Sequence, residues 1–168
     1  MPYRKKLNKV RKDENPKVKN AKKVIYDGIE FKSGLEAYCY KEGTTRGYKL
    51  EYESSRTILH ESDIYDSYIY APISTSKFKD KRSNLQIISR GTSITYTPDF
   101  TTTITSVSGI KYFVVIECKG LKTSTYNIKK NLYLGIKSKE LGQNFIFIEP
   151  HNQAQVRQAF DILDNFTK

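Results

Sequence analysis

The chain has 168 residues, two cysteines and a formal net charge of +11. This length suits one domain with its own hydrophobic core, without disulfide support, and we expect reduced thiols in an intracellular protein. No apolar stretch is long enough to cross a membrane, and no apolar region follows the charged N-terminus as in a secretory signal.

A basic surface attracts polyanions. We expect nucleic acid rather than membrane lipid as the partner, because no basic helix has a clean apolar face; a merely solvated basic surface is the alternative.

Residues 1–23 form a segment of their own, rich in Lys and Arg and nearly devoid of apolar residues. Such a composition cannot bury a core, so a flexible basic arm is predicted, followed by a single domain over residues 24–168. Arg4, Lys5 and Lys6 are candidate DNA contacts in this arm. A tail with no specific role is an equally open interpretation.

The folded part is predicted to begin with a hairpin over residues 24–31, which turns at an Asp-Gly pair. A helix follows, with Ser33 as its N-cap and Glu36 three residues on as the capping-box partner. Gly43 is predicted to end this helix.

Residues 48–97 are predicted to be mostly strands, because apolar and polar residues alternate over 48–53 and, in part, over 85–88. Between these strands, residues 62–84 are rich in tyrosine and then basic. This stretch suits a DNA-contacting loop or a plain surface insertion, and the sequence does not decide between them.

Residues 100–105 and 110–117 predict an antiparallel hairpin that turns at residues 106–109. Such a hairpin brings the start of its first strand beside the end of its second, so Asp99 and Glu117 should meet. Side chains alternate along a strand, so Glu117 and Lys119 should share one face, with Cys118 on the other.

Three further elements complete a mixed α/β core: a helix capped by Thr123 or Ser124 and running to about residue 141, a short strand over 144–149, and a helix over 153–166. Spacing predicts which apolar side chains face inward. These are Ile128, Leu132 and Ile136 in the first helix, and Val156, Phe160 and Leu163 in the second.

Two carboxylates and a lysine at the end of an apolar strand suit phosphodiester hydrolysis assisted by one or two Mg²⁺ ions, with Mn²⁺ able to substitute. Asp99 and Glu117 are the expected metal ligands, and the backbone carbonyl of Cys118 is an expected third. Lys119 would orient or help deprotonate the attacking water, or hold the scissile phosphate. Glu36 could complete the metal site.

The pairing of Pro98-Asp99 with Glu117-x-Lys119 resembles the signature of the PD-(D/E)XK nuclease superfamily. Three blocks are similar to those of bacteriophage endonuclease I, a family of Holliday-junction resolvases: SGLE at 33–36, YTPDF at 96–100 and ECKGL at 117–121. Residues 26–31 and 119–130 also look like a family of small phage nucleases. The resemblance spans most of residues 24–148.

This resemblance implies a restriction-endonuclease-like fold, in which helices flank a mixed β-sheet core. It also implies metal-binding Asp99 and Glu117, a catalytic Lys119 and an active-site Glu36. The implied activity is Mg²⁺-dependent cleavage of branched or four-way DNA by a homodimer, in the cytoplasm of a bacterial host if the protein is phage-encoded. A nuclease of general or sequence-specific duplex cleavage is one alternative, and a non-cleaving DNA-binding protein on the same fold is another.

The lysines that follow the second motif could reach the DNA backbone. These candidates are Lys122, Lys129 and Lys130; a solvated helix face is the alternative interpretation. His60 and His151 have no partner at ligand or triad spacing, so both are predicted to be structural or surface residues.

Overall fold

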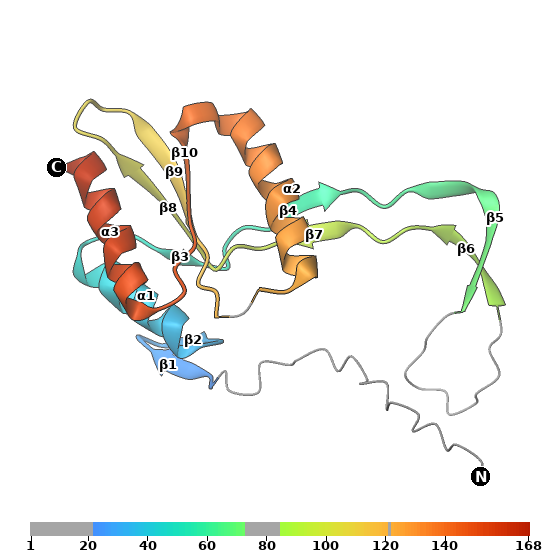
Figure 1. Cartoon of the computed structure of the whole chain (residues 1–168), viewed down its shortest axis with the longest axis horizontal. Coiled ribbons are helices and arrows are strands. Elements are labelled where there is room, and N and C mark those ends of the chain that lie inside the picture. Colours follow the sequence, from blue (N-terminus) through green and yellow to red (C-terminus); the bar gives the residue numbers. More distant parts are fainter. Residues whose placement is uncertain (1–21, 73–84, 121) are drawn as a thin grey trace, which may run out of the picture.

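The computed structural model of the chain describes residues 22–72, 85–120 and 122–168 (Figure 1). Its helices are α1 (Gly34–Thr45), α2 (Ser124–Leu141) and α3 (Gln153–Thr167), with a 3-10 turn η1 (Gly142–Asn144) after α2. Its strands are β1 (Val24–Tyr26), β2 (Ile29–Phe31), β3 (Glu51–Tyr52), β4 (Thr57–His60), β5 (Ile64–Pro72), β6 (Leu85–Arg90), β7 (Ile94–Tyr96), β8 (Phe100–Thr105), β9 (Lys111–Ile116) and β10 (Phe145–Ile148). The candidate DNA contacts Arg4, Lys5 and Lys6, and the basic stretch 77–82, lie outside the described residues. No helix in the described part of the chain is long and apolar enough to cross a membrane.

A four-stranded mixed sheet forms the centre of the fold, with the strand order β10-β9-β8-β3. The predicted hairpin is confirmed, since β8 and β9 pair antiparallel with Phe100 opposite Ile116. β10 then pairs parallel to β9. Both faces of β9 are covered, which explains its nearly continuous apolar sequence. The fold is therefore mixed α/β, as predicted.

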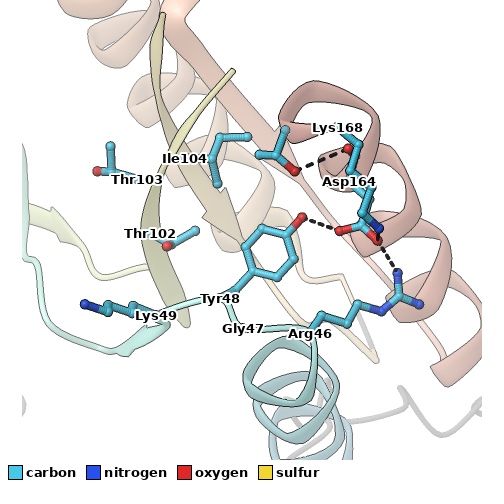
Figure 2. Close-up of a pocket in the computed structure, with 10 residues that line it drawn as sticks. Arg46, Gly47, Tyr48, Lys49, Thr102, Thr103, Ile104, Asp164 and Lys168 are labelled. Carbon is cyan, nitrogen blue, oxygen red and sulfur yellow. Dashed lines mark hydrogen bonds and ion pairs between the residues drawn. The ribbon is translucent and has the colours of Figure 1, made fainter. Parts of the chain in front are cut away.

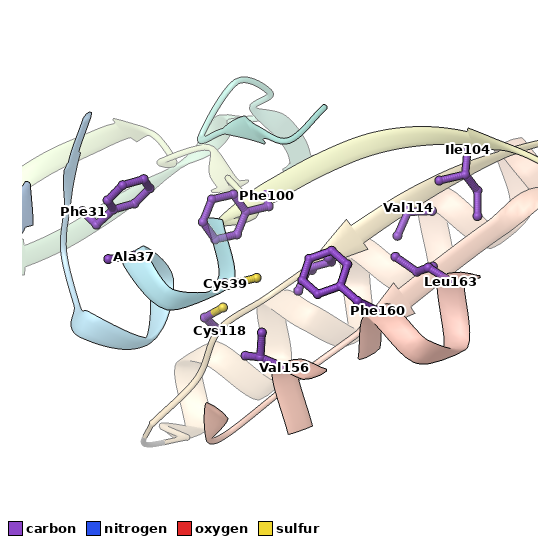
Figure 3. Packing of buried hydrophobic residues seen from close by; sticks show 11 residues of the cluster. Phe31, Ala37, Cys39, Phe100, Ile104, Val114, Cys118, Val156, Phe160 and Leu163 are labelled. Carbon is purple, nitrogen blue, oxygen red and sulfur yellow. The ribbon is translucent and has the colours of Figure 1, made fainter. Parts of the chain in front are cut away.

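Alternate residues of β9 face two separate apolar clusters. Val114 and Ile116 belong to the larger cluster, which α1 and α3 complete (Figure 3). Val115 belongs to the smaller one, which α2 covers from the other face of the sheet. The inward stripe predicted for the last helix is confirmed, because Val156, Phe160 and Leu163 are all buried.

The two cysteines lie in the larger cluster as free, buried thiols, as predicted. Figure 3 shows Cys39 of α1 beside Cys118, which follows β9. The Cys118 side chain thus points into the core, on the face opposite to the charged residues on either side of it.

Gly43 does not end α1, contrary to the prediction, because the helix continues to Thr45. Its role is a close contact with the core. A Cβ built at Gly43 would lie 2.5 Å from Cδ1 of Leu50 and 2.7 Å from Cζ of Phe160. A glycine is therefore needed where α1 crosses α3 and the segment that precedes β3.

The C-terminal ends of α1 and α3 are joined beside a cavity of about 640 Å³ (Figure 2). The hydroxyl of Tyr48 donates to Asp164 (2.7 Å), and Arg46 and Lys168 also contact this carboxylate. The hydrogen bond from Tyr48, followed by the one from Lys168, lowers the pKa of Asp164. None of the predicted site residues lines this cavity. The contacts of Asp164 join the two helices.

The inward stripe predicted for α2 is wrong. Ile128 and Leu132 are exposed and Ile136 is only partly buried, whereas Tyr126 and Tyr133 are buried. The reason is aromatic packing: the smaller cluster consists largely of aromatic rings from β7, β9 and β10. An aromatic pair contributes about 0.5–1.5 kcal/mol beyond the area that it buries. Helix α2 therefore packs its tyrosines, and not its aliphatic stripe, against the sheet.

Two antiparallel pairs, β4 with β7 and β5 with β6, extend from the core as a long arm (Figure 1). The expectation of strands over residues 48–97 is thus confirmed in outline, although residues 48–53 form only the two-residue strand β3. The tyrosine-rich stretch, for which the sequence favoured no element, includes strand β5.

The predicted N-terminal hairpin is also confirmed, with Asp27 and Gly28 at positive φ in its turn.

Candidate active site

Asp99 and Glu117 meet where β8 begins and β9 ends, as the hairpin predicted. The backbone N–H of Asp99 donates to Oε2 of Glu117 (3.1 Å), and the backbone N–H of Cys118 donates to Oδ2 of Asp99 (2.8 Å). Both residues are buried, with exposed fractions of 8% and 2%. Each carboxylate is therefore held by the backbone of the opposite strand.

The electrostatics of this pair are unfavourable for two negative charges. Burial, followed by the charge of Glu117, raises the pKa of Asp99 to about 8, although Lys119 acts in the opposite direction. Without a bound cation, the neutral form of Asp99 is therefore favoured up to a higher pH than in an exposed aspartate. A divalent cation between the carboxylates would remove this repulsion and allow both groups to ionise.

Lys119 forms an ion pair with Glu117, with 2.8 Å between Nζ and Oε1. The two side chains share a face of the strand, as predicted. Burial lowers the pKa of Lys119, but the charges of Glu117, Asp99 and Glu36 outweigh burial, so its pKa is raised overall. The Lys119 side chain is therefore protonated, so it is better suited to bind a phosphate than to accept a proton. It also lies 4.6 Å from the ring centroid of Tyr126.

Glu36 lies in the first turn of α1 and is buried. Its Oε1 accepts from the Ser33 hydroxyl (2.8 Å), and its Oε2 accepts from the Tyr52 hydroxyl (2.7 Å) and the backbone N–H of Lys32 (3.0 Å). Ser33 is the N-cap, as predicted, and accepts from the N–H of Glu36. The return bond differs from the predicted capping box, because it goes to Lys32, the residue before the cap.

A single pocket of about 400 Å³ collects the four predicted catalytic residues. Its walls come from the start of α1, from β7 and the residue after it, from the residues beside the start of β8 and the end of β9, and from the start of α2. The lining side chains include Glu36, Asp99, Glu117, Lys119 and Lys129. The structure thus brings together residues that are up to 93 positions apart in the sequence, and Lys129 joins them as a candidate phosphate contact.

The donor set fits a hard divalent cation such as Mg²⁺, which takes one or two carboxylates and keeps several waters. Asp99 and Glu117 would provide the carboxylates, and Lys119 alone does not balance their charge. Among the described residues, no three His, Cys, Asp or Glu side chains gather as a closed metal cluster. The proposed roles of Glu36 and of the Cys118 carbonyl as further ligands remain predictions.

The other two predicted lysines lie in a separate ion-pair cluster around Glu149. Lys122 and Lys130 contact the two oxygens of this carboxylate at 2.5 and 2.8 Å, and the Tyr126 hydroxyl donates to it at 2.6 Å. Burial raises the pKa of Glu149, but these three donors outweigh burial and lower the pKa to about 2. Lys122 and Lys130 therefore lie beside the pocket but are paired with Glu149.

His151 has two partners that the sequence did not indicate. Its Nδ1 lies 2.5 Å from the carbonyl oxygen of Lys119, and its Nε2 lies 3.1 Å from Oε1 of Glu149. The parallel pairing of β9 with β10 continues past the strands, since the N–H of Lys119 donates to the carbonyl of Pro150 (3.1 Å). Residues 149–151 thus run alongside residues 117–119. His60, by contrast, is exposed and contacts Asp63 (3.0 Å).

No protein-family model matches the chain, and no curated protein or solved structure matches it either.

Proposed function

We propose that this protein is a Mg²⁺-dependent endodeoxyribonuclease on a restriction-endonuclease-like core, selective for branched or four-way DNA. The observation that supports this most strongly is the buried pair Asp99 and Glu117 beside Lys119. Burying two adjacent acidic side chains costs stability, so their presence argues for a ligand that needs them. A divalent cation and a phosphate together account for two carboxylates and one protonated lysine in one pocket.

Each residue has a distinct chemical task in this proposal. Asp99 and Glu117 would hold the ion, which when bound neutralises phosphate charge and lowers the pKa of a water molecule. Protonated Lys119 binds a non-bridging oxygen of the scissile phosphate and stabilises the negative charge that develops there. Tyr126 and Glu117 fix the position of this ammonium group.

The basic wall of the pocket supports a polyanionic substrate. Lys129 lines the same pocket as the carboxylates, and Lys122 and Lys130 lie on the adjacent Glu149 cluster. With a net charge of +11, the chain would bind DNA mainly through its phosphates. The proposal of selectivity for branched DNA rests on the resemblance of the three motif blocks to those of a resolvase family. A nuclease that cuts linear duplex is the nearest alternative with the same chemistry.

The first prediction concerns the carboxylates. Asp99→Asn or Glu117→Gln should reduce cleavage at least ~100-fold, because the bound ion contributes several kcal/mol to transition-state stabilisation. DNA binding should stay close to that of the wild type. Glu140→Gln is the matched control, because this carboxylate is half exposed on α2 and does not line the pocket. Cleavage by either site variant at the wild-type rate in Mg²⁺ would show that the site is wrongly assigned.

The same assay distinguishes the substrates. A four-way junction, a flap, a nicked duplex and a linear duplex of matched sequence are incubated with the wild-type protein in Mg²⁺. Paired symmetric cuts confined to the junction would establish a resolvase. Equal cutting of the linear duplex would reject junction selectivity and favour a general duplex nuclease.

A further inference from the structure

Tyr96 carries a hydroxyl group that is buried and has no hydrogen-bond partner. Among the described residues, three buried side-chain oxygens share this property: Oγ of Ser55 and Oη of Tyr96 and of Tyr133. A buried polar group without a partner destabilises the fold, so such groups are rare and need an explanation. Of these three residues, only Tyr96 lines the pocket of the candidate active site.

The hydroxyl of Tyr96 lies near the carboxylate of Glu117. Burial, followed by the charge of Glu117, raises the pKa of Tyr96. The hydroxyl therefore keeps its proton and is a hydrogen-bond donor. Both side chains are enclosed, with exposed fractions of 6% for Tyr96 and 2% for Glu117. Within the described chain, however, this donor bonds to no acceptor.

Packing fixes the place of this hydroxyl. Tyr96 is the last residue of β7, where it pairs with Thr57 of β4. Its ring lies in the smaller apolar cluster with Val115, and its centroid is 4.7 Å from that of the Tyr133 ring. A tyrosine side chain has few rotatable bonds, so a packed ring leaves its hydroxyl little freedom. The hydroxyl is therefore held beside Glu117.

The Glu117 carboxylate has room for one more donor. An ionised carboxylate can accept hydrogen bonds at about four positions. Within the described chain, Nζ of Lys119 contacts Oε1 (2.8 Å) and the backbone N–H of Asp99 donates to Oε2 (3.1 Å). A bound cation would occupy a further position. This leaves a position for a donor that is already close, such as Tyr96.

We propose that Tyr96 is a positioning residue for Glu117, and that its hydroxyl donates to the Glu117 carboxylate when this carboxylate holds a divalent cation. Carboxylates that bind metal ions are ordinarily oriented by hydrogen bonds from surrounding residues. The bond formed in the loaded site would offset the cost of burying the hydroxyl. The inference rests on the cation site of the proposed function. Tyr96 lies in the motif block at 96–100, but the resemblance assigned it no role.

The hydroxyl of Tyr126 is the competing acceptor. It also lies near the hydroxyl of Tyr96, since each affects the pKa of the other. The Tyr126 hydroxyl itself donates to Glu149 (2.6 Å). A hydrogen bond to an ionised acceptor is about twice as strong as one to a neutral acceptor, so Glu117 is favoured. A bond to Tyr126 would form with or without a cation, which the test below distinguishes.

The test is a calorimetric titration of the full-length protein with Mg²⁺, together with thermal melts in EDTA. Tyr96→Phe removes only the hydroxyl. In EDTA its Tm should equal that of the wild type or exceed it by a few degrees, because an unpaired buried group is lost. Its dissociation constant for Mg²⁺ should rise ~10-fold or more, as is typical when a group that orients a metal ligand is removed.

Tyr133→Phe is the matched control. It removes a hydroxyl that is also buried and unpaired, from the ring packed against Tyr96, but Tyr133 does not line the pocket. Its Tm in EDTA should change in the same direction as that of Tyr96→Phe. Its dissociation constant for Mg²⁺ should stay that of the wild type.

A double variant shows whether the hydroxyl acts through Glu117. In the Glu117→Gln background, Tyr96→Phe should change the response to Mg²⁺ by less than it does in the wild type. Equal Mg²⁺ dissociation constants for the wild type and Tyr96→Phe overturn the inference and leave the cation site standing. If Tyr96→Phe then also has a lower Tm in EDTA, the hydroxyl bonds to Tyr126 instead. A wild type that does not bind Mg²⁺ overturns the proposed function and this inference with it.

Discussion

Asp99 is the residue at which folding and the proposed function oppose each other most clearly. In the folded chain it is buried beside Glu117 and its pKa rises to about 8, whereas in the unfolded chain an aspartate has a pKa of about 3.9. Between these two values the folded protein keeps a proton that the unfolded protein has released. Stability is therefore lost as the pH rises through this range, unless a cation binds.

This gives a prediction for the metal-free protein. Asp99→Asn cannot ionise, but its amide oxygen can still accept from the N–H of Cys118. The Tm advantage of the variant over the wild type should grow by several degrees between pH 5 and pH 8.5 in EDTA. Added Mg²⁺ should then raise the Tm of the wild type at pH 8.5 and leave that of the variant nearly unchanged.

The control for this prediction is Asp63→Asn, because Asp63 is exposed and lies outside the pocket. Its Tm difference from the wild type should not change with pH in the same way. A pH-independent difference for Asp99→Asn, measured by thermal melts at matched ionic strength, would show that Asp99 is ionised in the metal-free fold.

The parallel pairing of β9 and β10 extends the site beyond the motif residues. Because the two strands run in the same direction, their C-terminal ends lie together, and Glu149 and His151 emerge beside Lys119. Both histidine nitrogens face oxygen acceptors, the Lys119 carbonyl and the Glu149 carboxylate. This short segment thus fixes the backbone that carries the proposed catalytic lysine.

Two glycines inside helices, Gly43 of α1 and Gly135 of α2, lead to opposite predictions for stability. Gly43→Ala would place a methyl group against Leu50 and Phe160, and overpacking of about 1–3 kcal/mol should outweigh the gain of about 1 kcal/mol in helix propensity. Its Tm should fall by several degrees. The Tm of Gly135→Ala should rise, because a Cβ at Gly135 would meet no atom within 4 Å. Differential scanning calorimetry of the two variants checks this, and a rise for both would show that α1 has room at Gly43.

For the whole molecule, the distribution of charge matters more than its total. Among the lysines near the pocket, Lys129 lines the cavity, while Lys122 and Lys130 are paired with Glu149. Of these three lysines, Lys129 is therefore the one best placed to contact a phosphate in the pocket.

The predicted basic arm can be tested through salt. Removing residues 1–21 should weaken DNA binding and flatten the plot of log K against log salt, by about 0.9 for each phosphate of duplex DNA that the arm neutralises. Fluorescence anisotropy with the Asp99→Asn variant as the background avoids cleavage during the titration. A slope identical to that of the full-length chain would reject the arm as a DNA-binding element.

The sequence by itself determined the local elements and the centre of the site. Alternation and turn residues predicted the β8–β9 hairpin. The antiparallel pairing of a hairpin places the start of its first strand beside the end of its second, and therefore Asp99 beside Glu117. The cap at Ser33 and the limits of α2 and α3 followed from similar short-range rules. These features depend on residues that are near one another in the chain, so their pattern is visible in one dimension.

Only the tertiary structure decided which surfaces meet. Helical spacing marked Ile128 and Leu132 as a core stripe, but the rings of Tyr96 in β7 and of Phe145 and Phe147 in β10 pack on the tyrosines of α2 instead. The partners of His151 likewise arise from a parallel strand pairing across 32 residues. Such choices depend on the free energy of packing between distant elements, which the periodicity of a single segment does not contain.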